Sequence, residues 1–348
     1  PNDSGPAGRV HLQCATGGCA YNRVGLRFAG RGGLWVMSGG LASALRRHPA
    51  LIHLSLLLVA LFWGVTFVAV KYLVTRIGPV HVLLLRVGFS SACFAVLLAL
   101  TRRSIPSFPA SVWRRMALIA FAGVVVNNLA IAYGQSYLSA ALASLIVTSN
   151  PIFTTIISRL LLGEEFTRRK MAGIGLAAVG FLIVLLFGGS GAKFSVDNAI
   201  GVLILVCAPF GWAFYTVLAK PLLAEYEPHV IAGLTTILGA LMLSPLLLFN
   251  LDIVHDIAGF DGREWLAALT MSVLAIFVAY ILWYRGLRGL QPTQVAVYIY
   301  MVPFFGVLSA WLLLGESITP WLILGGGTIL TGVIVTNSRR RARSSPLA

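Results

Sequence analysis

Charged residues are scarce in this sequence, and acidic residues are the scarcest of them. The 348 residues include 26 Lys and Arg but only 11 Asp and Glu, so charged side chains make up 11% of the chain. Soluble domains carry roughly 25% charged residues, and a soluble fold could not hide the 58% of residues that are hydrophobic here. The composition therefore excludes an ordinary soluble domain and indicates that lipid surrounds most of the chain.

The sequence also lacks the residue sets that catalysis or metal binding would need. No Asp or Glu falls in the middle of an apolar segment, and no Ser/His or Cys/His arrangement stands out. A membrane protease or phosphatase would require such a set, and pumps that exchange protons for cationic drugs use a buried acid. Cys14 and Cys19 form a weak zinc pattern with only His11 nearby. We therefore expect no enzymatic activity, no metal and no cofactor.

Basic residues dominate what charge there is, and the formal net charge is +15. They sit in short clusters between apolar runs and form no continuous basic face with interleaved aromatic residues, so nucleic acid is a poor partner. With the N-terminus inside, sixteen Lys and Arg fall in cytoplasmic segments and four in outer loops. Because positive residues concentrate on the cytoplasmic side, we expect both termini in the cytoplasm and the chain in the inner (plasma) membrane.

Ten apolar segments are long enough for membrane helices, each of which needs roughly 20 apolar residues. They run over about residues 51–73, 79–101, 116–135, 138–162, 169–188, 198–219, 229–250, 264–284, 291–314 and 319–337. The prediction is an all-α integral membrane protein with ten transmembrane helices. Residues 1–49 form an N-terminal tail expected to be disordered, in which residues 1–36 precede the first methionine and read as an over-called start. Residues 338–348 form a basic C-terminal tail.

The second half of the chain repeats landmarks of the first. Between Asn150–Val184 and Val302–Thr336, eleven of 35 positions are identical, and both segments carry the run LLLGE. The repeats are expected over residues 50–188 and 198–337, with five helices each. Five is odd, so the second copy must enter the membrane in the opposite orientation. Inverted repeats are typical of secondary transporters; an inverted repeat in a channel or scaffold is the alternative.

The motifs WGVTFVAVKYL (63–73) and NPIFTTIISRLLLGEEFT (150–167), with Arg86 inside the second segment and their echoes in the second half, resemble the EamA family of the drug/metabolite transporter (DMT) superfamily. The resemblance covers about residues 50–338. It implies a ten-helix fold of five plus five inverted helices and a carrier function, and it identifies the family better than the substrate.

Polar and aromatic side chains inside apolar segments are candidates for a substrate cavity, because such groups are costly in lipid without a partner. Arg86 could attract a carboxylate or phosphate, or it could snorkel or pair with carbonyls. The resemblance implies that Arg is common here whatever the substrate, which favours the structural role. Gln294 and Tyr298 are four residues apart and hence on one helix face. The predicted lining is Trp63, Arg86, Asn127, Asn128, Trp212, Tyr215, Gln294 and Tyr298.

The repeated LLLGE runs predict two equivalent corners between consecutive helices. Gly163 and Gly315 are expected to end helices in the left-handed conformation, and Glu164 and Glu316 to lie near the positive ends of the helices that follow. A structural role is favoured over gating, because no buried partner for these acids is evident. Lys71 and Lys220 are expected to end their own helices.

The sequence therefore predicts a carrier that moves a small polar or amphipathic metabolite, such as an amino acid, across the inner membrane by alternating access, and outward. Efflux of xenobiotics and a non-transporting scaffold subunit are the alternatives. The expected partners are the lipid bilayer and a small-molecule substrate. Proton or solute counter-transport and a homodimer stay open.

Overall fold

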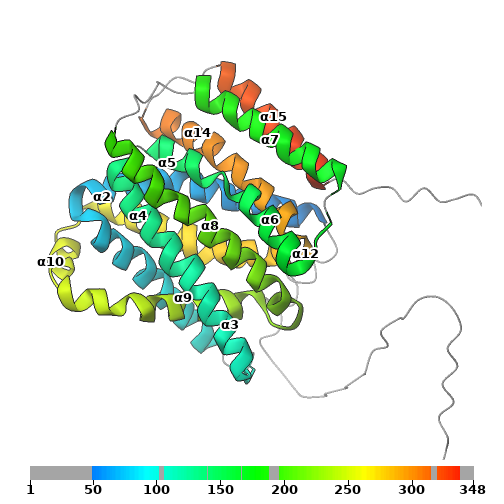
Figure 1. The fold of residues 1–348 in the computed structure, drawn as a ribbon. Helices are drawn as coiled ribbons and strands as arrows, with labels where there is room; N and C mark the ends of the chain where they lie inside the picture. The colour runs from blue at the N-terminus through cyan, green and yellow to red at the C-terminus, as the bar shows by residue number, and fades with distance from the viewer. Residues whose placement is uncertain are drawn as a thin grey trace, which may run out of the picture. The chain divides into compact units, whose positions relative to one another are not determined.

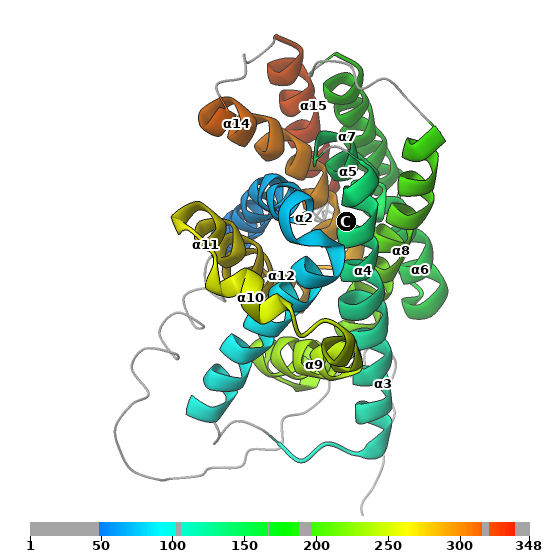
Figure 2. The same ribbon diagram turned by 90° about the vertical axis from the view of Figure 1, so that its left-hand side faces the viewer.

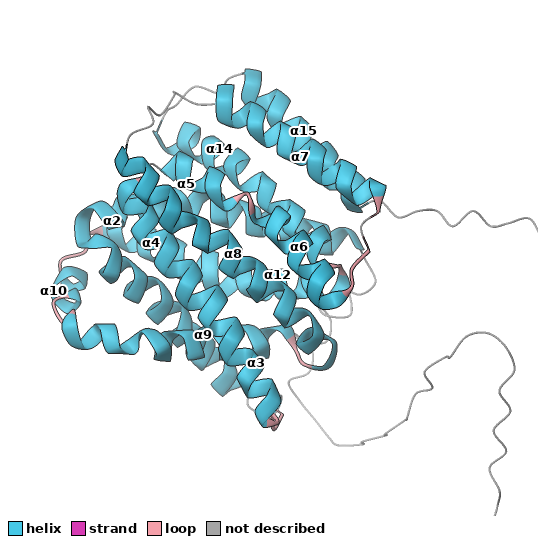
Figure 3. Cartoon of the chain, viewed as in Figure 1, coloured by secondary structure: helices cyan, strands magenta, loops and turns pink. Residues whose placement is uncertain are grey.

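The computed structural model describes residues 49–101, 106–138, 140–165, 167–187, 196–314 and 320–337. The elements in these ranges are helices, and no strand occurs among them (Figure 3). Five of the described helical stretches are long and apolar enough to cross a membrane: Ala50–Leu100, Ala110–Tyr137, Ile200–Glu225, Pro228–Phe249 and Gly262–Gly289. The all-helical, multi-pass membrane fold is therefore confirmed. Most of the predicted N-terminal tail and all of the C-terminal tail lie outside the described residues.

The described helices follow the apolar segments of the sequence closely. For example, the segment predicted at 169–188 is a helix over Arg168–Phe187. In chain order the elements are α2 (Pro49–Leu100), α3 (Ala110–Ala120), η2 (Phe121–Val126), α4 (Asn127–Tyr137), α5 (Ala140–Val147), α6 (Asn150–Leu162), α7 (Arg168–Phe187), α8 (Val196–Glu225), α9 (Pro228–Leu243), η3 (Ser244–Phe249), α10 (Ile253–Ala258), α11 (Gly262–Leu269), η4 (Thr270–Val278), α12 (Ala279–Gly289), α13 (Pro292–Ala296), η5 (Val297–Met301), α14 (Val302–Leu314) and α15 (Pro320–Asn337).

The first two predicted segments are the two halves of α2. Its 52 residues would measure about 78 Å as one straight helix, far more than the roughly 30 Å of a bilayer core. The helix breaks at Gly78, whose φ of 76° favours glycine, and Pro79 follows at a position where its missing N–H costs nothing. The chain changes direction there, so the two halves of α2 run along different lines (Figure 1).

The segment predicted as one helix over 138–162 is interrupted. Helix α5 ends at Val147, a turn follows at Thr148 and Ser149, and α6 begins at Asn150. Pro151 occupies the first turn of α6 and cannot donate a backbone hydrogen bond to a preceding turn, which is why the helix restarts here. The amide of Asn150 donates to the backbone oxygen of Pro209 in α8, at 2.8 Å, and ties the break to that helix.

Helices α7 and α15, which close the two halves of the sequence, lie side by side in both ribbon views (Figures 1 and 2). Glycines make this approach close. A Cβ added to Gly173 would lie 2.1 Å from Oγ1 of Thr336, and one added to Gly332 would lie 2.6 Å from the backbone oxygen of Gly173. Small residues at helix contacts are the usual device for tight packing in membranes.

Lys71 and Lys220 do not end their own helices, contrary to expectation, because α2 continues past Lys71 and α8 continues to Glu225. Each lysine instead binds the C-terminal end of another helix. Nζ of Lys71 donates to the backbone oxygen of Gln135 in the last turn of α4, at 2.9 Å. Nζ of Lys220 donates to the backbone oxygens of Leu287 and Leu290 at the end of α12, the latter at 2.7 Å. The favourable interaction of a cation with a helix C-terminus is therefore present, but between helices.

Candidate functional site

A cavity lies among helices from both halves of the chain. The cavity has a volume of about 40 Å³, enough for a small number of waters. Its walls come from both halves of α2 and from α4, α5, α8, α12, η5 and α14. The lining residues are Trp63, Thr66, Phe67, Val70, Arg86, Asn127, Ile131, Gln135, Val147, Trp212, Tyr280, Ile299 and Val302.

Helical periodicity explains how single helices contribute several side chains. Residues three, four and seven positions apart lie on one face of an α-helix. The first half of α2 contributes four at this spacing, Trp63, Thr66, Phe67 and Val70, and α4 contributes three at four-residue intervals, Asn127, Ile131 and Gln135. Two helix faces thus form much of the wall.

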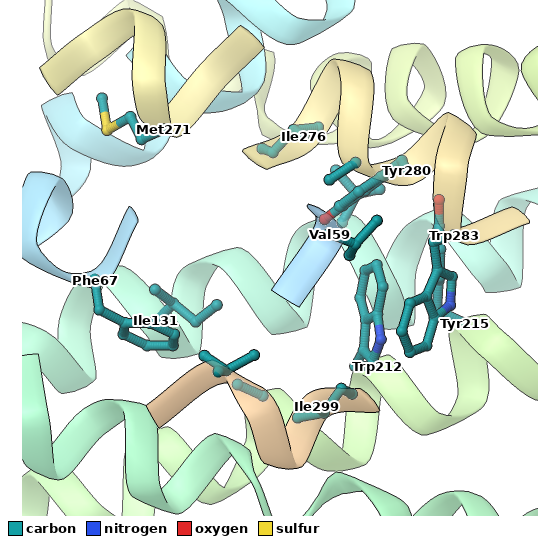
Figure 4. Close-up of a cluster of buried hydrophobic side chains, with 14 of the residues drawn as sticks. Val59, Phe67, Ile131, Trp212, Tyr215, Met271, Ile276, Tyr280, Trp283 and Ile299 are labelled. Carbon is teal, nitrogen blue, oxygen red and sulfur yellow. The ribbon is translucent and has the colours of Figure 1, made fainter. Parts of the chain in front are cut away.

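An aromatic cluster forms part of the cavity wall, which includes Trp63, Trp212 and Tyr280; Figure 4 shows Trp212 and Tyr280 beside Tyr215. The rings of Trp63 and Trp212 meet edge to face, with centroids 5.1 Å apart. Trp212 also contacts Tyr280 at 4.9 Å and stacks on Tyr215 at 4.6 Å. The indole N–H of Trp63 donates to the backbone oxygen of Ala275 in η4, at 2.8 Å, which fixes the orientation of that ring. Such pairs are stabilising beyond the area they bury.

Arg86 lies on the cavity wall and is 5% exposed. Its Nε is buried without a hydrogen-bond partner, and the ion pairs found among the described residues do not include it. The structural role expected for this residue was snorkelling or pairing with carbonyls, and Nε pairs with no carbonyl. A buried guanidinium with a free donor is costly for the fold. Its position is that of a cation available to an anion in the cavity.

Three more polar atoms on the cavity wall are buried without partners: Oγ1 of Thr66, Oε1 of Gln135 and Nε1 of Trp212. The amide of Gln135 is held in place because its Nε2 donates to the backbone oxygen of Phe67, at 3.2 Å. Buried polar atoms are bonded in the large majority of cases. Four unpaired ones on one cavity therefore mark it as a place where a bound molecule or water supplies the missing partners.

The structure brings four of the eight predicted cavity residues together. Trp63, Arg86, Asn127 and Trp212 line the cavity, and each lies on a different helical segment or on a different half of α2.

The other four predicted cavity residues lie outside the cavity lining and make structural contacts. The amide of Asn128 donates back to the oxygen of Val124, at 2.8 Å, and Tyr215 stacks behind Trp212. Gln294 accepts from the backbone N–H of Gln291 at the start of α13, in a capping box. The hydroxyl of Tyr298 forms a hydrogen bond with Nδ1 of His53. Gln294 and Tyr298 also belong to different elements, because α13 tightens into the 3₁₀ segment η5 between them.

Sequence reasoning did not assign Thr66, Ile131 or Gln135 to the cavity. A signal for each was present. Thr66 follows Trp63 by one helical turn, and Ile131 and Gln135 follow Asn127 by one and two turns. The residues one and two turns away from each predicted lining residue, on the same face of its helix, include all three.

The first predicted corner has the expected backbone. Gly163 adopts the left-handed conformation, with φ 64° and ψ 24°, and its N–H bonds to the oxygen of Arg159 at 3.1 Å. Oγ1 of Thr167 accepts from the backbone N–H of Lys170, at 3.2 Å, at the start of α7. The second corner, with Gly315 and Glu316, lies outside the described residues.

The expectation that Glu164 has no buried partner was wrong. Its carboxylate accepts hydrogen bonds from the hydroxyls of Ser158 and Thr293, and from Nζ of Lys170 at 2.7 Å. Nζ of Lys170 also donates to the amide oxygen of Gln291. We call these five residues the Glu164 cluster. It joins the α6–α7 corner of the first half to the start of α13 in the second half.

A second polar cluster joins the kink of α2 to the segment around α11. Arg76 pairs with Glu264, and Nδ1 of His81 lies 2.6 Å from a carboxylate oxygen of Asp256. Asp261 caps α11, because its side chain accepts from the N–H groups of Glu264 and Arg263. These hydrogen bonds, the one from Glu264 foremost, lower the pKa of the Asp261 carboxyl.

Among the described residues, no group of three or more His, Cys, Asp and Glu side chains could hold a metal ion. Of the four unpaired atoms of the cavity, two nitrogens can only donate, one hydroxyl can donate or accept, and one amide oxygen can only accept. Because a metal cation needs several acceptors, this set suits an organic molecule better.

The chain is similar to known proteins in both sequence and fold. Residues 50–186 and 199–338 both match the EamA-like transporter family. The chain is 26% identical to an "Uncharacterized transporter" of Archaeoglobus fulgidus, over 82% of this chain and 98% of that protein. It is 27% identical to a "Probable amino-acid metabolite efflux pump" of Salmonella typhimurium, over 83% and 97%. A solved crystal structure with 19% sequence identity superposes with a TM-score of 0.67 over 84% of this chain and 99% of that chain, which shows a shared fold.

Proposed function

The chain belongs to the EamA-like transporter family, and we propose that it is a secondary carrier that moves a small polar or amphipathic metabolite out of the cell by alternating access. The observation that carries this proposal is the cavity with four unpaired polar atoms between the two halves of the chain. A site formed by both repeats can open to one side or to the other as the repeats move.

We propose that the two polar clusters are the alternating contacts of this carrier, one on each side of the cavity, because each joins the first repeat to the second. The Glu164 cluster lies about two turns before Ile299 of the cavity wall, and the Arg76–Glu264 pair lies about two turns after Val70. Breaking one cluster while the other holds would open one side only.

We further propose the topology that the sequence predicts. Ten transmembrane helices form two inverted repeats over residues 50–188 and 198–337, and both termini lie in the cytoplasm. The membrane is the inner (plasma) membrane of the cell. Single cysteines at Arg168 and Arg263, introduced after replacement of the native cysteines, test this orientation in intact cells. An impermeant thiol reagent should label the second position and spare the first; the reverse pattern contradicts the topology.

The outward direction and the amino-acid class rest on two supports. The Salmonella relative is named a "Probable amino-acid metabolite efflux pump", and the cavity combines aromatic rings with hydrogen-bonding groups that suit a zwitterion. An efflux carrier for cationic xenobiotics is the alternative. It is less favoured because the cavity lining contains Arg86 and no Asp or Glu.

Counterflow in sealed proteoliposomes tests the carrier. Vesicles preloaded with unlabelled amino acids should accumulate the labelled form transiently and saturably. Val147 lines the cavity, so the larger side chain of Val147→Trp should fill the cavity and abolish this flux. Val179 lies on the exposed face of α7, so Val179→Trp should leave the flux unchanged. Folded protein that carries no solute from a broad panel of amino acids, organic acids and cationic dyes would instead support a scaffold subunit.

A further inference from the structure

The guanidinium of Arg86 differs in its partners from five other described cations. Arg76, Lys170 and Arg288 each have a carboxylate partner. Lys71 and Lys220 each donate to backbone oxygens. Arg86 is as deeply buried as any of these, yet its Nε has no acceptor and no carboxylate pairs with it. Within the described part of the chain, the fold therefore holds a cation in the cavity wall without supplying its counterion.

The unpaired atoms of the cavity lining have a definite donor and acceptor pattern. Nε of Arg86 and Nε1 of Trp212 can only donate, and the hydroxyl of Thr66 can donate or accept. Oε1 of Gln135 can only accept. Donors beside a guanidinium match the oxygens of a carboxylate, which accepts several hydrogen bonds. A lone acceptor matches an ammonium or amine group.

Most of the remaining wall is apolar, and only Trp63, Asn127 and Tyr280 add further polar side-chain atoms. Phe67, Val70, Ile131, Ile299 and Val302 contribute no polar side-chain atom, and the aromatic cluster adds flat surface. Specific sites commonly combine such an apolar lining with few placed polar groups. This wall suits an apolar side chain and would leave a second charged group unpaired.

We propose that Arg86 is the residue that binds the substrate carboxylate, and that the cavity, enlarged beyond its present volume of about 40 Å³ as the repeats move, selects amino-carboxylates with an apolar side chain. The inference rests on the proposed carrier function and makes it specific. The carboxylate bonds to Arg86, with Trp212 and Thr66 as further donors, and the amine bonds to Oε1 of Gln135. Without the carboxylate, a ligand leaves the guanidinium unpaired, so uncharged and cationic analogues are rejected.

The test compares leucine with two analogues on purified, full-length protein, using quenching of tryptophan fluorescence for binding. Leucinamide keeps the amine but lacks the carboxylate, and 4-methylpentanoate keeps the carboxylate but lacks the amine. We expect leucine to bind, leucinamide to bind at least tenfold more weakly, and 4-methylpentanoate to fall between them. Equal binding of leucine and leucinamide would overturn the assignment.

Substitutions then locate the effect. Arg86→Gln should weaken leucine binding at least tenfold and leave leucinamide binding unchanged, and Arg86→Lys should restore part of the difference because it keeps the charge. Arg159→Gln, an exposed arginine on α6 outside the cavity, is the matched control and should bind like the parent. Unfolding temperatures without ligand show whether each variant is folded. If Arg86→Gln is folded and binds leucine as the parent does, Arg86 has no role in recognition.

Counterflow separates this inference from the proposed function. Saturable counterflow of a solute that lacks a carboxylate, with no binding of leucine or of other apolar amino acids, would keep the carrier and overturn the carboxylate site. Absence of flux for every solute, with leucine bound through Arg86, would keep the site and overturn the carrier.

Discussion

The Glu164 cluster offers the sharpest test of how the two repeats are held together. Lys170→Met removes the ammonium group that lies 2.7 Å from the carboxylate of Glu164. The Glu164 side chain is 3% exposed and that of Lys170 is 11% exposed, so solvent screens this pair very little. Among the described residues, Lys170 is the cation that pairs with this carboxylate, and the variant leaves a buried negative charge.

The expected loss of stability follows from what remains around the carboxylate. Removing one partner of a buried ion pair costs about 3–5 kcal/mol. The hydroxyls of Ser158 and Thr293 still donate to Glu164, and hydrogen bonds to a charged group contribute about 1.5–3 kcal/mol each. We therefore expect a loss near the lower limit, about 3 kcal/mol. On the scaling found for soluble domains, this lowers the unfolding temperature by about 6–12 °C.

Thermal unfolding of the protein in detergent, followed by intrinsic fluorescence, measures the effect. The set comprises Lys170→Met, Glu164→Gln and the double variant, with Arg168→Met, an exposed neighbour, as the matched control. The double variant should lose less stability than the two single variants together, because the second change removes the charge that the first left unpaired. Additive losses, or a Lys170→Met protein as stable as the control, would refute the reasoning.

Three further substitutions test local features of the fold by the same thermal assay or by hydrogen exchange. Gly163→Ala places a Cβ on a left-handed residue and should destabilise the corner by about 1–2 kcal/mol, whereas Gly175→Ala, with open space around the added Cβ, should not. Gly332→Ala brings a Cβ within 2.6 Å of backbone atoms of α7 and should cost about 1–3 kcal/mol, while Gly327→Ala, which meets nothing, should be neutral. Folding lowers the pKa of the Asp261 carboxyl from its usual 3.8. The Asp261 cap therefore stabilises α11 above pH 3.8, and this stabilisation is lost as the pH falls through the pKa of the folded state. Protection of the α11 amides from hydrogen exchange should therefore drop in acid. The Asp261→Asn variant should not show this drop. If the variant loses protection in acid as the parent protein does, the assignment to Asp261 is contradicted.

The sequence determined the helices better than the cavity, for a physical reason. Apolar runs and breaks are local, so the bounds of α7 and the break at Gly78 and Pro79 could be read directly. Which face of a helix meets which neighbour depends on packing between distant segments. Asn127 and Asn128 are adjacent and look equally suitable, yet Asn127 lines the cavity and Asn128 bonds to its own helix.

The Glu164 cluster shows the same limit. The capping role of Gly163 is a local property and was predictable from its place after an apolar run. The partners of Glu164 were not, because Thr293 is 129 residues away in the sequence. Burial of an acid at a helix end therefore cannot be recognised from the hydropathy of its own segment. For that reason an acid with no evident buried partner in the sequence forms a contact between the repeats.

The strongest structural sign of two related halves lies in contacts that recur at equivalent positions. Lys71 and Lys220 are 149 residues apart, and each donates to the backbone oxygen two residues before the end of a helix, at Gln135 in α4 and at Leu287 in α12. Trp63 and Trp212 have the same separation and touch edge to face.

A matching pair of lysine contacts is expected only if both halves pack their first and third long helices in the same way. The matching tryptophans, by contrast, come from different halves and touch each other. These equivalent residues of the two EamA-like halves meet at the wall of the cavity that also contains Arg86. The site is therefore placed where neither repeat alone could form it, and where a change in the packing between repeats would alter it directly.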